Sequence, residues 1–259
     1  MYKQIIIGKK LILFDLDGTI ADTEPLWQLA LTNVMARENV FLQTYRDLVR
    51  MPGLPNTEKW KIIVSENTIK SGKTAEQLNQ ETTTEFLKIL ETEELDTRPG
   101  FWELAFYFKK EKELKLGLTT NSSKDVAEKI LEKIGIKETF DYKIYGDDVK
   151  NLKPDPEMYK KALSMAKVNA KEVLVFEDSP TGAASAEAAN LDLIVIWNGL
   201  TAKSLYPEST IFFMLDFEGL ANNLEMTFEE AFKDFQNTVL KNQEDKTNPQ
   251  TQKQPREAQ

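Results

Sequence analysis

The sequence predicts an α/β fold, a parallel sheet flanked by helices with an all-helical part inserted after the first strand. Three observations lead to this fold class. Residues 11–14, LILF, are four consecutive apolar residues, typical of a strand that is buried on both faces. Residues 20–98 show helical patterns only, and short apolar runs then alternate with amphipathic stretches. Such alternation is typical of parallel strands joined by right-handed crossovers.

The first strand is followed by a run of expected helices. Asp22–Pro25 carries the residues that favour a helix start, so a helix is predicted from there to about residue 38. Further helices are predicted over 56–70 and 74–91, separated by Ser71 and Gly72. The absence of a strand pattern here indicates a separate helical subdomain.

The remaining chain is expected to complete the sheet. Predicted strands cover residues 114–120, 142–145, 173–176, 193–197 and, at an edge, 211–215. Predicted helices cover residues 101–112, a stretch ending at Gly135, and residues 156–167.

These elements define the expected domains. The α/β core would comprise residues 1–21 and 95–225, and the helical subdomain residues 22–94. Residues 226–241 carry Phe228, Phe232, Phe235 and Val239 at helical spacing, which predicts an amphipathic helix packed on the core. A partner-binding helix is the alternative. Residues 242–259 are polar and are expected to form a disordered tail.

Composition limits the chemistry that this chain can perform. The 33 basic and 42 acidic residues give a net charge of −9, which argues against nucleic acid or an anionic membrane as a partner. The chain has neither cysteine nor histidine, so thiolate, Ser-His and His-metal chemistry are excluded. Carboxylates, hydroxyls and lysines remain for catalysis. The N-terminal residues fit neither a signal peptide nor a membrane span, so we expect a cytoplasmic protein, and a monomer.

Polar residues follow the predicted strands where each strand ends. Asp15 and Asp17 come directly after the first strand, in a turn where Gly18 lets the backbone approach a ligand. In open α/β sheets the ligand crevice lies beyond the carboxyl ends of the strands. An aspartate turn that caps a helix explains this motif about equally well by itself.

Three later strand ends carry further functional groups. Thr119–Ser123 offers hydroxyls and free amides at a helix start, a phosphate cradle or a plain helix cap. Lys153 precedes a helix begun by proline, and is either held near the strand ends or solvated like most lysines. Glu177 and Asp178 end a buried strand, where two carboxylates need a neutralising cation.

Taken together, these strand ends carry what phosphoryl transfer through an aspartyl phosphate needs. A nucleophilic carboxylate, an acid/base carboxylate, a hydroxyl, a lysine and metal-binding acids all meet at one edge of a sheet. The hard oxygen donors of the acids suit Mg²⁺, which leaves positions for water and phosphate.

The sequence here resembles the haloacid dehalogenase-like (HAD) superfamily, in its phosphatases and phosphomutases with a helical cap. The resemblance covers roughly residues 10–198. It rests on four motifs in order, which are Asp15-Leu16-Asp17-Gly18-Thr19, Thr120-Asn121, Lys153-Pro154-Asp155-Pro156 and Glu177-Asp178-Ser179. It implies a Rossmann-like core and a cap over about residues 23–94 that contributes leaving-group specificity.

The resemblance also implies roles for individual residues. Asp15 would be the nucleophile, and Asp17 the general acid and base. Thr120 and the amide of Asn121 would bind the transferring phosphoryl group. Lys153 would offset charge on Asp15 and on the phosphate.

The remaining roles concern the metal and the substrate. Mg²⁺ would be held by Asp15, the backbone carbonyl of Asp17 and Asp178, with Glu177 supporting it directly or through water. Thr19 and Trp27 join Asn121 among the residues assigned to substrate binding. The Trp27 ring would stack on a sugar face, although a tryptophan on a helix more often serves packing, by roughly two to one.

The sequence departs from similar sugar phosphomutases at two places. They usually have a histidine on the first cap helix, about where Trp27 stands, and a basic residue shortly after a glycine in a cap loop. Here Gly53 is followed by Leu54, Pro55 and Asn56. Both departures favour hydrolysis over mutase chemistry.

The sequence therefore predicts an Mg²⁺-dependent phosphatase that acts on a small phosphorylated metabolite, such as a sugar phosphate. A β-phosphoglucomutase-like enzyme is the alternative within the same class. A non-enzymatic phospho-acceptor switch is the alternative from another class, although the acid/base Asp17 has little use in a lasting switch. A dehalogenase fits less well because carbon-halogen displacement needs neither Asp17 nor Mg²⁺.

Overall fold

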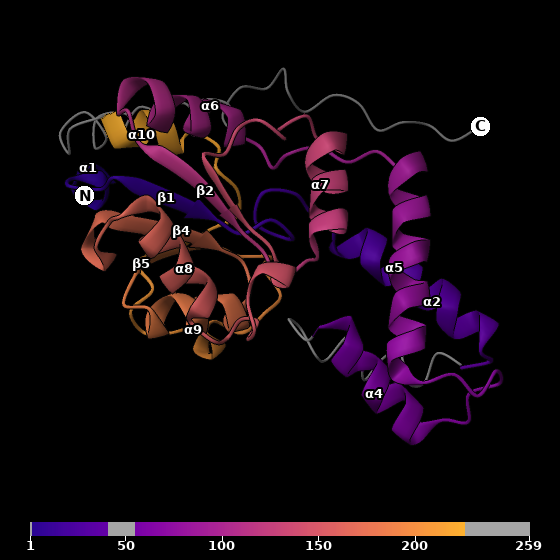
Figure 1. Ribbon diagram of the computed structural model, residues 1–259. Helices are drawn as coiled ribbons and strands as arrows, with labels where there is room; N and C mark the ends of the chain where they lie inside the picture. Colours follow the sequence, from indigo (N-terminus) through magenta and orange to yellow (C-terminus); the bar gives the residue numbers. More distant parts are fainter. Residues whose placement is uncertain (1, 41–54, 226–259) are drawn as a thin grey trace, which may run out of the picture. The chain divides into compact units, whose positions relative to one another are not determined.

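The computed structural model describes residues 2–40 and 55–225 (Figure 1). The chain divides into two compact units, Gly8–Glu218 and the combination of Met1–Ile7 with Gly219–Gln259. In the smaller unit, helix α1 (Tyr2–Ile6) packs against helix α10 (Leu220–Glu225). The predicted helix over 226–241 and the predicted tail lie outside the described residues. No helix in the described ranges has the length and apolar character needed to span a membrane.

The larger unit contains a six-stranded sheet in the order β3-β2-β1-β4-β5-β6. Every pairing of neighbouring strands is parallel, which confirms the predicted fold class. The strands are β1 (Leu11–Phe14), β2 (Lys115–Thr119), β3 (Tyr142–Ile144), β4 (Val173–Glu177), β5 (Asp192–Ile196) and β6 (Phe212–Met214). As predicted, the strand near residue 211 lies at an edge.

Strand β1 occupies the centre of the sheet, and its four residues are buried. The chain runs from β1 to β2 on one side and, after β3, returns to pair β4 with the other side of β1. The connection order therefore reverses between β1 and β4. Ligands of open α/β sheets bind beyond the strand ends at such a reversal.

The helices of the larger unit follow the predicted ones closely. They are α2 (Glu24–Arg37), α4 (Asn56–Glu66), α5 (Ala75–Thr92), α6 (Phe101–Phe106), α7 (Lys124–Lys133), α8 (Glu157–Ala166) and α9 (Pro180–Ala188). Helix α4 ends four residues before the predicted end, because Asn67 is extended and its side-chain amide donates to the carbonyl of Ile63. The predicted helix over 101–112 continues past α6 as a π-helical turn, η1 (Tyr107–Glu111).

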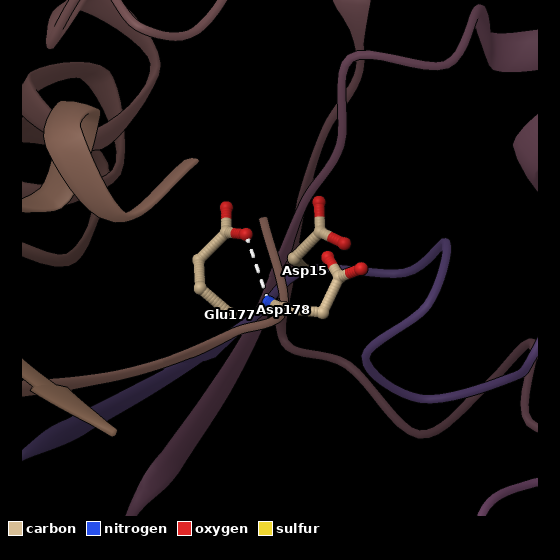
Figure 2. Close-up of side chains that lie close together, drawn as sticks. All are labelled: Asp15, Glu177 and Asp178. Carbon is tan, nitrogen blue, oxygen red and sulfur yellow. Dashed lines mark hydrogen bonds between the residues drawn. The ribbon is translucent and has the colours of Figure 1, made fainter. Parts of the chain in front are cut away.

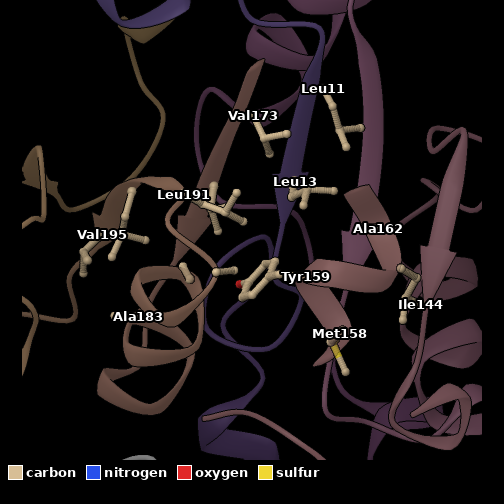
Figure 3. Packing of buried hydrophobic residues seen from close by; sticks show 14 of the residues in the cluster. Leu11, Leu13, Ile144, Met158, Tyr159, Ala162, Val173, Ala183, Leu191 and Val195 are labelled. Carbon is tan, nitrogen blue, oxygen red and sulfur yellow. The ribbon is translucent and has the colours of Figure 1, made fainter. Parts of the chain in front are cut away.

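Aliphatic side chains fill the core on one face of the sheet (Figure 3). Leu11 and Leu13 of β1 lie there with Val173 and Val175 of β4, because alternate residues of a strand point to the same face. Helices α8 and α9 cover this face. They contribute Met158, Tyr159, Ala183 and Ala186 to the cluster.

Aromatic rings fill the core on the opposite face. Phe14 of β1 stacks on Phe176 of β4 with ring centroids 5.0 Å apart. Phe101, at the start of α6, meets Phe14 edge to face at 5.6 Å. Phe217 contacts both Phe14 and Phe101 at 5.9 Å, so four rings form one contiguous group.

Between β1 and α6, the described residues form helices α2, α4 and α5 and no strand. We call these helices the helical insertion. They have a hydrophobic core of their own, in which Trp60 is fully buried against Leu31, Val34 and Leu78. The Trp60 indole donates to the hydroxyl of Thr82 at 2.9 Å, so its polar atom is satisfied.

The aromatic group makes a prediction about stability. Phe101 is fully buried, whereas Phe106 on the same helix is 59% exposed. Phe101→Ala should lower the free energy of unfolding by about 3–5 kcal/mol, because it leaves a cavity among the rings. Urea unfolding followed by circular dichroism measures the change.

Phe106→Ala is the matched control, and it should cost under about 1 kcal/mol because the ring is largely in water. Equal losses for the two variants would contradict the packing described for this face.

Candidate active site

The carboxyl ends of β1, β2 and β4 lie level with one another. Phe14 pairs with Leu118 of β2 and with Phe176 of β4, and the Asp15 amide donates to the Phe176 carbonyl at 3.0 Å. Asp15 and Glu177 therefore leave the sheet side by side. They do so at the reversal between β1 and β4, where a ligand crevice is expected.

Lys153 lies at the centre of this edge and is almost fully buried. Its Nζ is 2.8 Å from Asp15 Oδ1 and 2.6 Å from Glu177 Oε1. The same ammonium donates to the carbonyl of Thr119 at 2.8 Å. Three oxygens thus accept its three protons, which a buried ammonium requires. Lys153 is held at the strand ends, not solvated.

Asn121 places Lys153 through its backbone. The Asn121 side-chain oxygen accepts from the Lys153 amide at 3.0 Å, and its amide group donates to the Lys153 carbonyl at 3.3 Å. This side-chain clasp is separate from the backbone amide of Asn121, to which phosphate binding was assigned.

Tyr159 of α8 supports the same group. Its ring lies 5.2 Å from the Lys153 Nζ, and its hydroxyl donates to Glu177 Oε1 at 2.9 Å. Sequence reasoning missed Tyr159, because an aromatic residue on an amphipathic helix has the same pattern whether it packs or supports a site.

The carboxylates of Asp15, Glu177 and Asp178 form one cluster (Figure 2). One oxygen from each lies within 4.8 Å of the others. Two glycines make room for them. A side chain at Gly18 would overlap the carboxylate of Asp178, and one at Gly182 would overlap that of Glu177. Gly18 also has φ +85°, a conformation that glycine adopts without strain.

These acids shift one another's protonation. Burial, together with the charges of Glu177 and Asp17, raises the pKa of Asp15 to about 8 even though the ammonium of Lys153 opposes the shift. Burial and the charges of Asp15 and Glu177 raise the pKa of Asp178 well above its usual range. Burial lowers the pKa of Lys153, but Asp15 and Glu177 outweigh it and hold that pKa well above normal. One ammonium does not neutralise three acids.

The cluster fits a divalent cation. Its donors are carboxylate oxygens, the hard ligands that Mg²⁺ prefers. Burial and mutual repulsion raise the pKa values of Asp15 and Asp178 despite Lys153, and a second cation would favour the ionised form of both. Asp15 and Asp178 present their carboxylates to each other (Figure 2), whereas Glu177 Oε1 already accepts from Lys153 and Tyr159.

The Asp17 side chain lies outside this cluster, in a hydrogen-bond network of its own. Its Oδ1 accepts from the Thr23 hydroxyl at 2.7 Å and from the Trp27 indole at 3.3 Å. Its Oδ2 accepts from the Ser122 hydroxyl at 2.7 Å and from the Thr120 hydroxyl at 3.3 Å. Four donors, two from the loop after β2 and two from the start of α2, therefore fix the carboxylate.

Trp27 connects this network to the helical insertion. Its ring stacks on Phe86 of α5 with centroids 3.8 Å apart, so one face is covered by protein. Its indole nitrogen donates to Asp17, which is a contact that the sequence did not predict. Thr19, also assigned to substrate binding, is fully buried and donates to Asp15 Oδ2 at 3.2 Å.

Arg98 ties the end of the insertion to the same loop. Its Nε donates to the carbonyl of Gly18 at 2.8 Å, and its backbone amide donates to the carbonyl of Ile20 at 2.6 Å. The chain thus enters and leaves the helical insertion beside the loop that carries Asp15 and Asp17.

Ser122 and Thr23 contact Asp17, which the sequence does not predict. Ser122 belongs to the predicted phosphate cradle or helix cap at 119–123, and Thr23 to the predicted helix start. Their hydroxyls face Asp17 because two turns meet there, and one sequence gives no signal for such a meeting.

Comparison with known proteins supports the resemblance. The haloacid dehalogenase-like hydrolase family matches residues 12–196. A phosphorylated carbohydrates phosphatase of Thermotoga maritima is 34% identical over 184 residues, which cover 71% of this chain and 82% of that protein. Validoxylamine A 7'-phosphate phosphatase of Streptomyces hygroscopicus is 30% identical over 70% of this chain and 83% of its own length.

Solved structures agree in fold. A crystal structure from Thermotoga maritima, provisionally assigned as a beta-phosphoglucomutase, has a TM-score of 0.68 at 28% identity and covers 83% of this chain and 98% of that chain. A family IA HAD hydrolase of Entamoeba histolytica has a TM-score of 0.71 at 22% identity, covering 85% and 96%. With the family match and the parallel sheet in agreement, this chain belongs to the haloacid dehalogenase-like hydrolase family.

Proposed function

We propose that this enzyme is an Mg²⁺-dependent phosphatase that hydrolyses a small phosphorylated sugar or related metabolite through an aspartyl phosphate. The observation that carries the proposal is the contact of the buried Lys153 ammonium with Asp15 at 2.8 Å, beside the carboxylates of Glu177 and Asp178. A nucleophilic carboxylate needs such positive charge, because it must approach an anionic phosphate.

In the first half-reaction, an oxygen of Asp15 attacks the phosphorus and the ester bond to the alcohol breaks. Asp17 donates its proton to the leaving alcohol oxygen. Thr120 and the Asn121 amide hold oxygens of the transferring group, and Lys153 offsets their charge. When bound by Asp15, the Asp17 carbonyl and Asp178, Mg²⁺ supplies further neutralisation of the phosphate charge.

In the second half-reaction, water attacks the phosphorus of the aspartyl phosphate and the bond to Asp15 breaks. Asp17, now ionised, takes the proton of that water. This return of the proton completes the cycle. Four hydrogen bonds fix the Asp17 carboxylate in one position, which suits a group that acts as the acid in the first half-reaction and as the base in the second.

The substrate class rests on the relatives. The Thermotoga relative is a phosphatase of phosphorylated carbohydrates, and hexitol phosphatase B of Escherichia coli is 27% identical over 71% of this chain. The helical insertion would contribute leaving-group specificity. The stretch that lacks the basic residue of similar mutases is Gly53 to Asn56, of which residues 53 and 54 lie outside the described residues. Trp27, where those mutases have a histidine, contacts Asp17 and Phe86.

The nucleophile gives the first prediction for this function. Asp15→Asn should lower phosphate release from p-nitrophenyl phosphate with Mg²⁺ by at least about 10³-fold, because the amide cannot form the acyl phosphate. Asp125→Asn, at an exposed position in the first turn of α7, should stay within about twofold of wild type. Undiminished turnover by Asp15→Asn would refute the proposed nucleophile.

The second prediction separates hydrolysis from the mutase alternative. With glucose 1-phosphate as substrate, inorganic phosphate should form faster than glucose 6-phosphate, since the sequence lacks the histidine and basic residue of similar mutases. Phosphate is measured by molybdate colour, and glucose 6-phosphate by a coupled dehydrogenase. Faster isomerisation would assign the chain to the mutases.

The third prediction concerns pH in metal-free protein. The pKa of Asp15 is raised to about 8, so the folded state keeps a proton that the unfolded state releases near pH 4. The stability from this proton is present at low pH and is lost as pH rises through about 8. Chelator-treated wild type should therefore lose free energy of unfolding between about pH 5 and pH 9.

Asp15→Asn removes this titration and should show a shallower decline in urea unfolding over the same range. Added Mg²⁺ should stabilise wild type more at about pH 8 than at about pH 6, because it binds ionised carboxylates. Parallel pH curves for wild type and Asp15→Asn would contradict the raised pKa.

A further inference from the structure

Lys59 of α4 is a buried cation within the helical insertion. It is 8% exposed and precedes Trp60, which is fully buried in the core of the insertion. Lysine is almost never buried to this extent without a partner, because removing an ammonium from water costs several kcal/mol. The buried ammonium of Lys59 therefore needs an anion nearby to offset the loss of water.

The anion that the structure places there is a weak partner. Lys59 Nζ lies 3.7 Å from Glu24 Oε1, which is longer than a hydrogen bond. The Glu24 side chain is 54% exposed, and the same oxygen accepts from the Gln28 amide at 3.2 Å. Among the described residues, this loose ion pair is the interaction found for Lys59. An ammonium has three protons to donate, so it retains capacity for a further acceptor.

The location of this ammonium connects it to the reaction. Glu24 begins α2 directly after Thr23, whose hydroxyl donates to Asp17, and Trp27 follows one turn later. Lys59 thus lies beside the turn of α2 that contacts the proposed acid and base. Because Asp17 would protonate the leaving alcohol, this turn borders the side of the site that receives the leaving group.

Two further cations that the structure describes at the site, Lys153 and Arg98, are already engaged. Lys153 donates to Asp15, Glu177 and the Thr119 carbonyl, so it serves the transferring phosphoryl group. Arg98 donates to the Gly18 carbonyl and lies 3.8 Å from Asp22. A second anionic group on the substrate would need another cation, and Lys59 offers one on the leaving-group side.

We propose that Lys59 determines specificity by binding a second anionic group, a phosphate or a carboxylate, on the alcohol part of the substrate. This inference rests on the proposed phosphatase function. Binding would replace the loose contact with Glu24 by a charge-assisted hydrogen bond, so a leaving alcohol that carries an anionic group is preferred over a neutral one.

Two pairs of substrates test the preference. Fructose 1,6-bisphosphate is compared with fructose 1-phosphate, and 6-phosphogluconate with glucose 6-phosphate, each by kcat/KM for phosphate release. In at least one pair, wild type should prefer the member with the additional anionic group by about 10- to 100-fold, as expected for a hydrogen bond between charged groups. The pair that shows the preference identifies the anion. Equal rates in both pairs overturn the proposal without any variant.

Variants of α4 assign the preference to Lys59. In the pair for which wild type shows a preference, Lys59→Met should bring the ratio of the two kcat/KM values to near one. Lys59→Arg should retain most of the wild-type ratio. Lys61→Met is the matched control, because Lys61 is on the same helix, 52% exposed, and paired with Glu58. It should leave both rates and their ratio unchanged.

Other outcomes overturn the inference. Lys59 does not bind the second anion if Lys59→Met lowers kcat/KM equally for both substrates of a pair. The same conclusion follows if Lys61→Met also abolishes the difference in kcat/KM between them. Should Lys59→Met not fold, the ratio in Lys59→Arg and its salt dependence decide, since a preference insensitive to salt contradicts ion pairing. Absence of phosphate release from every substrate, equal to Asp15→Asn, instead refutes the proposed function itself.

Discussion

The buried ammonium of Lys153 joins four segments of this chain. It contacts the ends of β1 and β4 through Asp15 and Glu177, the end of β2 through the Thr119 carbonyl, and α8 through the ring of Tyr159. Removing one partner of a buried ion pair typically costs about 3–5 kcal/mol, because the remaining charges stay uncompensated. The arrangement that would serve catalysis is thus also a constraint on folding. One ammonium does not hold all three acids ionised, and this makes the edge of the sheet receptive to a second cation.

The carboxylate of Asp17 accepts hydrogen bonds from both the core and the helical insertion. Thr120 and Ser122 of the core loop reach one oxygen, and Thr23 and Trp27 at the start of the insertion reach the other. A displacement of α2 therefore changes the hydrogen bonds of the proposed acid and base. Specificity and proton transfer are linked in this way, since the helices that would receive the leaving group also hold the carboxylate that would protonate it.

The strand ends were predictable because they depend on local patterns. Four apolar residues followed by Asp15 indicate a buried strand and its terminal acid, and the parallel sheet brings Asp15 and Glu177 to one edge. Tyr159 and Thr23 were not predictable as parts of the site, and neither was the contact of Ser122 with Asp17, because these roles come from helices and turns that meet only in the folded chain. For Trp27 the sequence left open stacking on a sugar or packing within the protein. It could not name the packing partner, because Phe86 lies far along the chain.

The attachment of Arg98 to the loop at Gly18 and Ile20 bears on how the chain reaches its native topology. Leu11 of β1 pairs with Lys115 of β2, so these two strands can pair only after the whole insertion between them has been synthesised. Because the insertion has its own apolar core, we expect it to condense early and to bring residues 20 and 98 together. Strands β1 and β2 would then be joined by a short effective loop when they pair. Each halving of a loop's length lowers the entropic cost of closing it by about 0.6 kcal/mol. For the pairing of β1 with β2, the long insertion would then act as a short loop.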